Sequence, residues 1–314
     1  MNKMEETFLQ LVRLGIGTSN RAILPDTIDL PDLEALAECQ GLAAILAAGL
    51  KQISDERIQS APTLGWIHKA EQESEYRFEV LCRVIKGIIQ KNEVDGLKTV
   101  ILNPFCQDWP RPELRPSDDI YLWICGKQKV SYSLLVFKER RGKAYSYRHF
   151  RCLKSRRWMN VVLEECGENK IDDANLSGEK IYVSSPDFMA FFLIFRSISL
   201  FRSTGIKLCY LLDWAFFVNM HREDVDWNGL HSALDKYHMR DIYDCLNAIC
   251  VEELGFDSKI FPYVQFDPKM KENVLNDILY PSKFAEGDRC LVRKCMSIFR
   301  QRSNNAWKLE LSHK

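Results

Sequence analysis

The sequence lacks the short motifs and the long apolar segments that mark several large protein classes. None of its 314 residues form a GxSxG, P-loop or GxGxxG motif, so serine hydrolases, P-loop NTPases and Rossmann dehydrogenases gain no support. The longest apolar run, residues 189–201, is interrupted by Arg196 and is shorter than the roughly 20 residues of a membrane span. The first residues also lack the apolar core of a signal peptide. We therefore expect a cytoplasmic protein that does not enter a membrane.

Metal-binding spacing and an excess of charge are absent as well. The 11 cysteines include no CxxC pair, and the histidines show no HExxH or HxxxH spacing, so we expect free thiols and no structural metal. The 43 basic residues are matched by 43 acidic residues. This balance argues against a protein that binds a polyanion over its whole surface, but it is compatible with a local basic patch.

The patterns that are present divide the chain into three regions. Residues 1–93 have helical periodicity, including an apolar stripe over 33–53 that Asp32 is expected to cap and a second stripe over 66–90. Residues 94–185 contain short runs of β-branched and aromatic residues. Residues 186–314 are helical again, with helices expected at about 205–221, 227–236, 239–253 and 284–300. This order predicts an α+β fold: a small mixed sheet between N-terminal helices and a C-terminal helical domain.

Within the middle region, four segments are expected to form strands. They are residues 99–102, 120–124, 132–137 and 158–163, each bounded by turn-forming or charged residues. The polar stretch 165–180 is expected to be an exposed loop.

The most informative segment is LNPFCQDWPRPELRPSDDIYLWI, residues 102–124. It reads as a strand, a proline-rich turn that holds two arginines, and a second strand that opens on paired acids. Acids at alternate positions of a strand point to one face and together hold a divalent metal against a triphosphate, and an arginine pairs with phosphate oxygens.

The second half of this segment, LRPSDDIYLWI, resembles the D-x-D strand of the nucleotidyltransferase superfamily that includes DNA polymerase beta. It is most similar to an uncharacterised bacterial family that carries a motif like RPSGDIDLLV. Two further segments, ALAECQGLAAIL (35–46) and GIKLCYLLDWAFFV (205–218) followed by VDWNGL, resemble other parts of that family. The resemblance implies a nucleotidyltransferase-like core that binds an NTP and Mg²⁺ and transfers a nucleoside monophosphate to an unknown acceptor.

Carried over residue by residue, the resemblance assigns these roles. Asp119 would be the catalytic metal ligand, and Glu164 would be the acid on a later strand. Asp118 becomes a further ligand only if a β-bulge re-aims it, because adjacent strand residues face opposite ways. The expected nucleotide contacts are Arg115, Ser117, Asn103 and Tyr121.

The sequence departs from the family pattern at several of these positions. Tyr121 replaces the second carboxylate, and a neutral hydroxyl is a poor Mg²⁺ ligand. Asn103 and Pro104 replace the Lys-Gly pair before the turn, and Asp118 replaces a glycine. An aspartate restored at position 121 is expected to tighten Mg²⁺–nucleotide binding. These departures leave two hypotheses: an enzyme with an impaired site, and a catalytically inactive binding or regulatory protein of the same fold.

Two other features invite interpretation. Residues 138–157 hold nine Lys or Arg and one Glu, interleaved with aromatic residues, which is typical either of an RNA-binding ribbon or of a solvated hairpin. Asp213, within the family-like C-terminal segment, is expected to have a structural role, either as an inward-facing polar anchor or as an N-cap-type partner.

Overall fold

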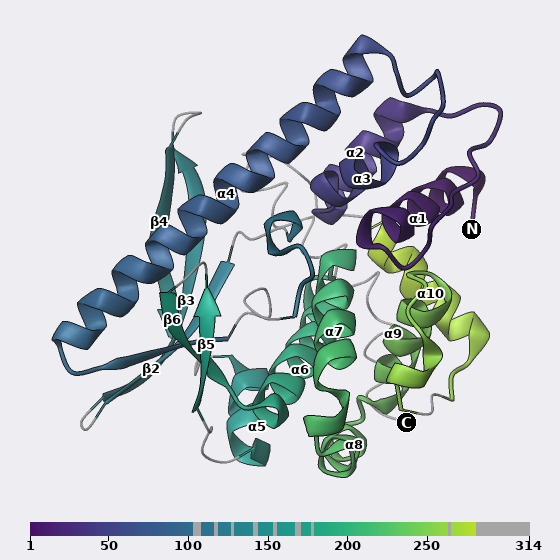
Figure 1. Ribbon diagram of the computed structural model, residues 1–314. Helices are drawn as coiled ribbons and strands as arrows, with labels where there is room; N and C mark the ends of the chain where they lie inside the picture. Colours follow the sequence, from purple (N-terminus) through teal and green to yellow (C-terminus); the bar gives the residue numbers. More distant parts are fainter. Residues whose placement is uncertain are drawn as a thin grey trace, which may run out of the picture.

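The computed structural model describes residues 1–102, 108–115, 119–126, 129–140, 144–152, 156–166, 171–176, 179–262 and 265–280. The N-terminal part consists of α1 (Lys3–Ile16), α2 (Leu30–Gln40), α3 (Ala43–Leu50) and the 34-residue α4 (Ala61–Val94). At a rise of 1.5 Å per residue, α4 is about 50 Å long. It runs across the sheet and past the first three helices (Figure 1), so it joins the two parts of the molecule.

A six-stranded mixed sheet follows. Its strands are β1 (Lys98–Ile101), β2 (Asp119–Gly126), β3 (Lys129–Arg140), β4 (Ala144–Cys152), β5 (Ile171–Leu176) and β6 (Glu179–Ser184). Their order is β4-β3-β2-β1-β6-β5, with β1 parallel to β6 and every other pair antiparallel. The α+β class and the mixed sheet predicted from the sequence are therefore confirmed.

Helices cover both faces of this sheet. Asn92 of α4 donates a hydrogen bond of 2.7 Å to Thr99 of β1, which places α4 on one face. Tyr121 of β2 packs edge-on against Phe192 of α6 (Pro186–Ser203). In the β1–β2 register, Thr99 lies opposite Ile124, three positions from Tyr121. Because successive strand residues alternate between faces, α4 and α6 lie on opposite faces.

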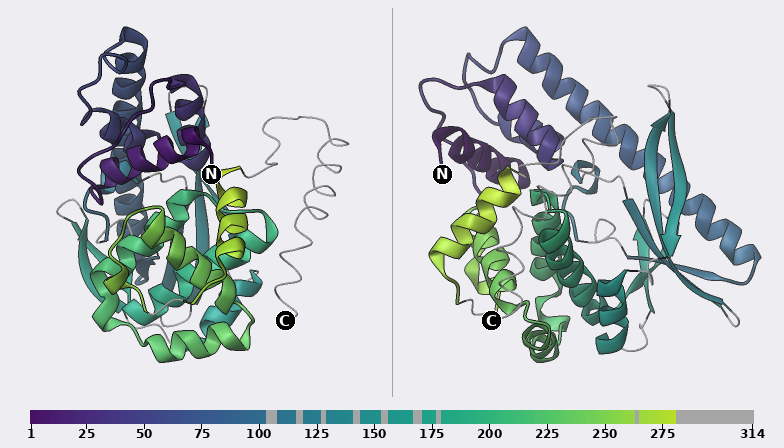
Figure 2. Two further views of the ribbon diagram at one scale, coloured as in Figure 1. Left: turned by 90° about the vertical axis from the view of Figure 1, so that its right-hand side faces the viewer. Right: turned by 180° about the vertical axis from the view of Figure 1, so that it is seen from behind.

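The C-terminal part is helical, as expected. It comprises α7 (Leu208–His221), α8 (Trp227–Lys236), α9 (Arg240–Glu252) and α10 (Pro268–Leu279), with short 3-10 turns at Arg222–Asp224 and Ser258–Ile260. A further 3-10 turn, Pro112–Leu114, lies between β1 and β2. Figure 2 shows these helices beside α1 and α6, away from the outer strands β3 and β4. Buried apolar side chains from all three regions form one continuous core. The expected boundaries at residues 93 and 185 stay a prediction, and the helix expected over 284–300 lies outside the described residues.

Two helix predictions need correction. The stripe over 33–53 is not one helix, because Gly41 adopts a left-handed conformation with φ of 69° and ends α2 before α3 begins. Glycine reaches this conformation without the steric cost that other residues meet. The cap of α2 is Asp29, whose side chain accepts a hydrogen bond from the Asp32 backbone N–H, and not Asp32 itself.

Two predictions in the middle region were also wrong. Residues 158–163 belong to a helix, α5 (Arg157–Cys166), in which Trp158, Met159 and Val162 are buried and Asn160 is exposed. That spacing is helical rather than alternating. The stretch 165–180 contains β5 and the start of β6 instead of a loop. β5 is an edge strand, and an edge strand tolerates the exposed acids Asp172 and Asp173.

Candidate functional site

Three neighbouring inner strands have their ends close together where the predicted motif lies. β1 ends at Ile101, and the next residue, Leu102, donates a backbone hydrogen bond of 2.9 Å to the Tyr121 carbonyl near the start of β2. The parallel partner β6 ends beside them, with Val183 paired to Ile101. The end of β1, the start of β2 and the end of β6 therefore lie side by side, and we call this place the sheet edge of the motif. α6 begins directly after β6.

A buried ion pair ties the proline-rich turn to α7. The Arg115 guanidinium donates to both carboxylate oxygens of Asp213, from Nε at 2.7 Å and from Nη2 at 2.8 Å. Both side chains are buried. The Trp109 indole N–H donates to the same carboxylate at 3.1 Å, so two residues of the turn are held by one acid. The expectation that Asp213 is an inward-facing anchor is confirmed by these contacts.

A second arginine shares this carboxylate. Arg196 of α6 is 1% exposed, and its Nη2 lies 3.5 Å from the second carboxylate oxygen of Asp213. Its guanidinium carbon lies 4.9 Å from the ring centres of both Tyr121 and Tyr210. Among the described residues, its Nε has no hydrogen-bond partner. Arg196 is therefore held mainly by aromatic rings and by a long contact to an acid that another arginine already occupies.

We call Trp109, Arg115, Tyr121, Arg196 and Asp213 the arginine cluster. In its described residues, two guanidinium charges face one carboxylate. Burial works against the charged form of Arg115, but the adjacent Asp213 outweighs it and holds the pKa of Arg115 above its ordinary value. A second buried carboxylate, that of Asp108, also lies close enough to Arg115 to interact with it electrostatically.

An acid–histidine pair adjoins the cluster. Asp108, next to Trp109, is buried and lies 2.9 Å from Nε2 of His221 at the end of α7. The other ring nitrogen lies 3.6 Å from the Asp224 carboxylate. The hydrogen bond with the Asp108 carboxylate raises the pKa of His221, against the opposing effect of burial. Burial raises the pKa of Asp108 itself. The pair fastens the turn to α7 at a second point.

The residues predicted from the motif have different places in the structure. Arg115 and Tyr121 lie together in the arginine cluster. Asp119 is the first residue of β2 and pairs with Val136, and the structure does not describe its side chain. Asn103, Ser117 and Asp118 lie outside the described residues.

Glu164 is placed elsewhere. It is exposed on helix α5, 3.7 Å from Lys236 of α8, and not on a strand of the sheet. Within the part of the chain that the structure describes, no group of three His, Cys, Asp or Glu side chains could hold a metal ion. The described residues alone therefore do not fit a magnesium ion, and Asp119 with Asp118 remain the predicted ligands.

Several residues of the cluster were not found from the sequence. Arg196 was visible only as the charge that interrupts an apolar run, which is itself a signal, because a buried arginine needs partners. Trp109, Asp108 and His221 carried no signal, since their contacts bridge more than 100 positions of sequence.

Comparison with known proteins identifies no relative: no protein-family model matches the chain, and neither a curated protein nor a solved structure is similar to it at a significant level. Among the described residues, no helix is both long and apolar enough to cross a membrane.

Proposed function

We propose that the protein is a nucleotidyltransferase-like protein that binds a nucleoside triphosphate at the sheet edge where β1 ends and β2 begins, and that it transfers the nucleoside monophosphate to an acceptor. The observation that carries this proposal is the arginine cluster at the motif itself. Arg115, which the motif assigns to the triphosphate, shares the Asp213 carboxylate with Arg196. The cluster therefore holds two guanidinium groups close to the proposed triphosphate site, and guanidinium groups are well suited to stabilise phosphate charge.

In this proposal the arginines act through their field and through positioning. Arg115 is fixed by Asp213 in a bidentate geometry, so little conformational entropy of its side chain is lost when the nucleotide binds. Arg196, whose guanidinium lies against the ring of Tyr121, adds a second positive charge. The described residues do not form a metal site. A dependence of nucleotide binding on Mg²⁺ stays a prediction that rests on Asp119 and Asp118.

A second candidate, a catalytically inactive nucleotide-binding protein of the same fold, is favoured by one specific observation. Tyr121, at the position of the second catalytic acid, is 6% exposed and is packed between Phe192 and Arg196. A residue built into the core in this way contributes packing rather than metal coordination. Glu164 also faces away on α5.

Turnover separates the two candidates. Wild-type protein is incubated with each of the four α-³²P-labelled NTPs and Mg²⁺, with cellular RNA and then with cellular protein as acceptor, and the label on the acceptor is followed. Transfer that is lost in Asp119→Asn but kept in the control Asp172→Asn, an exposed acid on β5, supports the enzyme. Binding of an NTP without any transfer supports the inactive protein. RNA as the labelled acceptor would support the role predicted for residues 138–157, which include the end of β3 and all of β4.

A further inference from the structure

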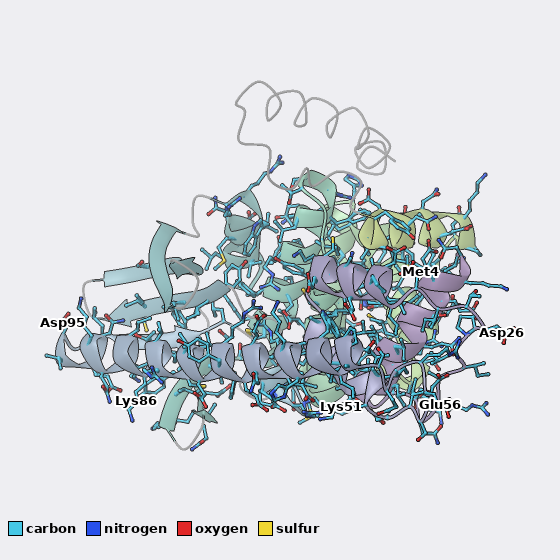
Figure 3. The ribbon with its side chains drawn as sticks, turned by 90° about the horizontal axis from the view of Figure 1, so that it is seen from above. Met4, Asp26, Lys51, Glu56, Lys86 and Asp95 are labelled. Atoms are coloured by element: carbon cyan, nitrogen blue, oxygen red, sulfur yellow. The ribbon has the colours of Figure 1, made fainter. Side chains whose placement is uncertain are left out.

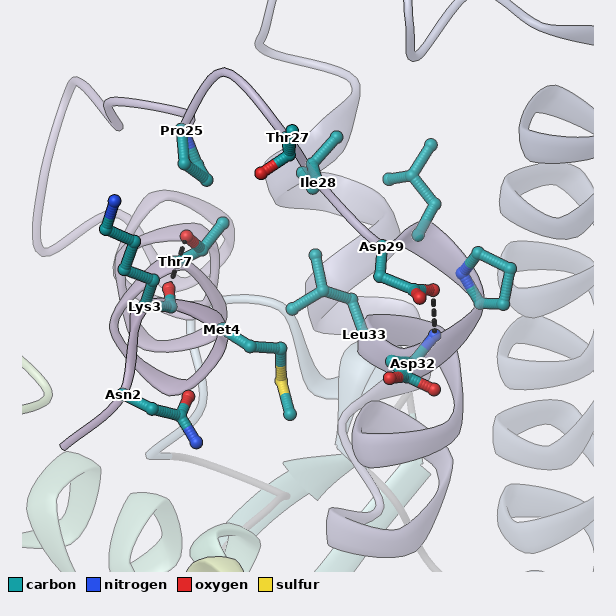
Figure 4. Close-up of a pocket in the computed structure, with 12 residues that line it drawn as sticks. Asn2, Lys3, Met4, Thr7, Pro25, Thr27, Ile28, Asp29, Asp32 and Leu33 are labelled. Carbon is teal, nitrogen blue, oxygen red and sulfur yellow. Dashed lines mark hydrogen bonds between the residues drawn. The ribbon is translucent and has the colours of Figure 1, made fainter.

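A pocket far from the arginine cluster lies between α1 and the start of α2. Its volume is about 880 Å³. The first turn of α1 lines one side with Asn2, Lys3 and Met4, and Pro25 together with residues 27–33 lines the other. Met4 and Leu33 point toward the space between the two helices, while Asp29 and Asp32 stand at its other side (Figure 4). The pocket therefore combines an apolar floor with a rim that is acidic on the α2 side and carries Lys3 on the α1 side.

The acidic character extends well beyond the rim. Residues 22–50 contain five acids, namely Asp26, Asp29, Asp32, Glu34 and Glu38, and no lysine or arginine. Burial and the nearby Glu38 raise the pKa of Glu34, as expected where acids crowd. Asp26 and Met4 lie at the end of the molecule opposite Asp95 of α4 (Figure 3). Arg57 forms an ion pair with Asp55 and also donates to the backbone carbonyls of Pro25 and Asp26.

The described chain ends at this pocket. Tyr280 follows α10, and its hydroxyl donates a 2.6 Å hydrogen bond to Glu5 and lies 3.3 Å from the Asn2 side-chain amide. Asn2 lines the pocket. The next residues, 281–314, thus begin at the pocket's wall. A segment of 34 residues is long enough to reach every part of it several times over.

The composition of residues 281–314 complements the pocket. The segment holds eight Lys or Arg and three Asp or Glu, whereas the chain as a whole is neutral. Its apolar residues, among them Leu291, Met296 and Phe299, alternate with basic ones such as Arg293 and Lys294. Apolar side chains flanked by basic ones fit an apolar floor with an acidic rim.

We propose that residues 281–314 of the same chain dock in the pocket between α1 and α2. The basic residues of the segment pair with Asp32 on the rim and with the exposed Asp26 next to it, and its apolar residues cover Met4, Ile28 and Leu33. The local concentration of a segment attached at Tyr280 favours this occupant over a partner in solution, because docking is intramolecular.

Hydrogen–deuterium exchange of the full-length chain tests the proposal from both sides. In the wild type, we expect slow exchange of backbone amides in residues 284–302 and in residues 25–33. The rim variant Asp26→Lys/Asp32→Lys should speed exchange in 284–302 about tenfold, since exchange tracks the population of the open form. The matched control Asp172→Lys, which reverses an exposed acid on β5, should leave exchange in 284–302 unchanged.

Exchanging the charges of the segment and of the pocket gives the most decisive test. Arg293→Glu/Lys294→Glu should speed exchange in residues 25–33, and combining it with Asp26→Lys/Asp32→Lys should restore protection in both segments. Thermal unfolding of each variant verifies that the rest of the chain is folded. Exchange of 284–302 at the rate of an unstructured peptide in the wild type would overturn the proposal. Protection that grows with protein concentration would also overturn it, because the occupant would then be the segment of a second copy.

Discussion

The guanidinium carbon of Arg196 lies 4.9 Å from the ring centre of Tyr121, so a buried cation faces the position at which the resemblance would place a second acid. A carboxylate at position 121 would lie close enough to Arg196 to form an ion pair. The tyrosine instead offers the negative face of its ring, which attracts the guanidinium without cancelling its charge.

This relationship changes the outcome expected for Tyr121→Asp. The motif alone predicts tighter Mg²⁺–nucleotide binding. Beside Arg196, however, the new carboxylate would form an ion pair with the guanidinium and lower the positive charge near the proposed nucleotide site. We therefore expect nucleotide affinity to fall, on the order of tenfold. The measurement is calorimetric titration of ATP into both proteins, with and without Mn²⁺. Tyr121→Phe keeps the ring and should bind as the wild type does; a gain of affinity in Tyr121→Asp would contradict the account.

Asp213 should be one of the most sensitive positions for stability. Asp213→Asn removes the only described carboxylate within 4 Å of either Arg115 or Arg196 and leaves two buried cations. Loss of one partner of a buried pair typically costs about 3–5 kcal/mol in the free energy of unfolding. Urea denaturation measures this, with the exposed Asp235→Asn on α8 as control. A cost within 0.5 kcal/mol of the control, the scatter of ordinary surface changes, would show that the cluster is not held as described.

Two glycines fix the close approach of α1 and α3. A Cβ at Gly15 would lie 2.1 Å from the Ile45 carbonyl oxygen, and one at Gly49 would lie 2.2 Å from that of Leu11. Gly15→Ala and Gly49→Ala should each lower the free energy of unfolding by about 1–3 kcal/mol, because the backbones must separate. Gly87→Ala on α4, where nothing lies within 4 Å, should instead raise it by up to about 1 kcal/mol. Equal effects at all three sites would refute this packing.

Two half-buried histidines, His221 and His231, should respond to pH in opposite directions. The hydrogen bond with Asp108 raises the pKa of His221, so its contribution to stability is complete below about pH 6.5 and is lost as pH rises through the folded-state pKa. Burial, together with Arg240, lowers the pKa of His231, so its contribution is present above about pH 6.5 and is lost as pH falls.

Thermal unfolding between about pH 5 and 8.5 checks this, since both pKa values lie near 6.5 when unperturbed. The difference in melting temperature between wild type and His221→Gln should shrink as pH rises. The difference for His231→Gln should shrink as pH falls. The same slope for both variants would contradict the assignment.

The sequence predicted the elements better than their contacts. Periodicity located α6 to α9 and the first strands because apolar spacing is a local property. It failed at residues 158–163, where a short run rich in valine and tryptophan suited a strand as well as a helix. It placed Arg115 and Tyr121 in one site because both lie in one motif. It could not reveal that Asp213 and Arg196 join them, since only the packing of α6 and α7 brings those residues to the sheet edge.

Isothermal titration calorimetry tests most directly the proposal that a nucleoside triphosphate binds where β1 ends and β2 begins, beside the arginine cluster. ATP, CTP, GTP and UTP are titrated with Mg²⁺ into wild type, Arg196→Gln and the control Arg202→Gln, an arginine on the same helix that donates to the His238 carbonyl. We predict that at least one NTP binds the wild type and Arg202→Gln with a Kd below about 1 mM, and Arg196→Gln about tenfold more weakly. If no NTP binds the wild type below about 1 mM, or if Arg196→Gln binds as tightly as the wild type, the claim is wrong.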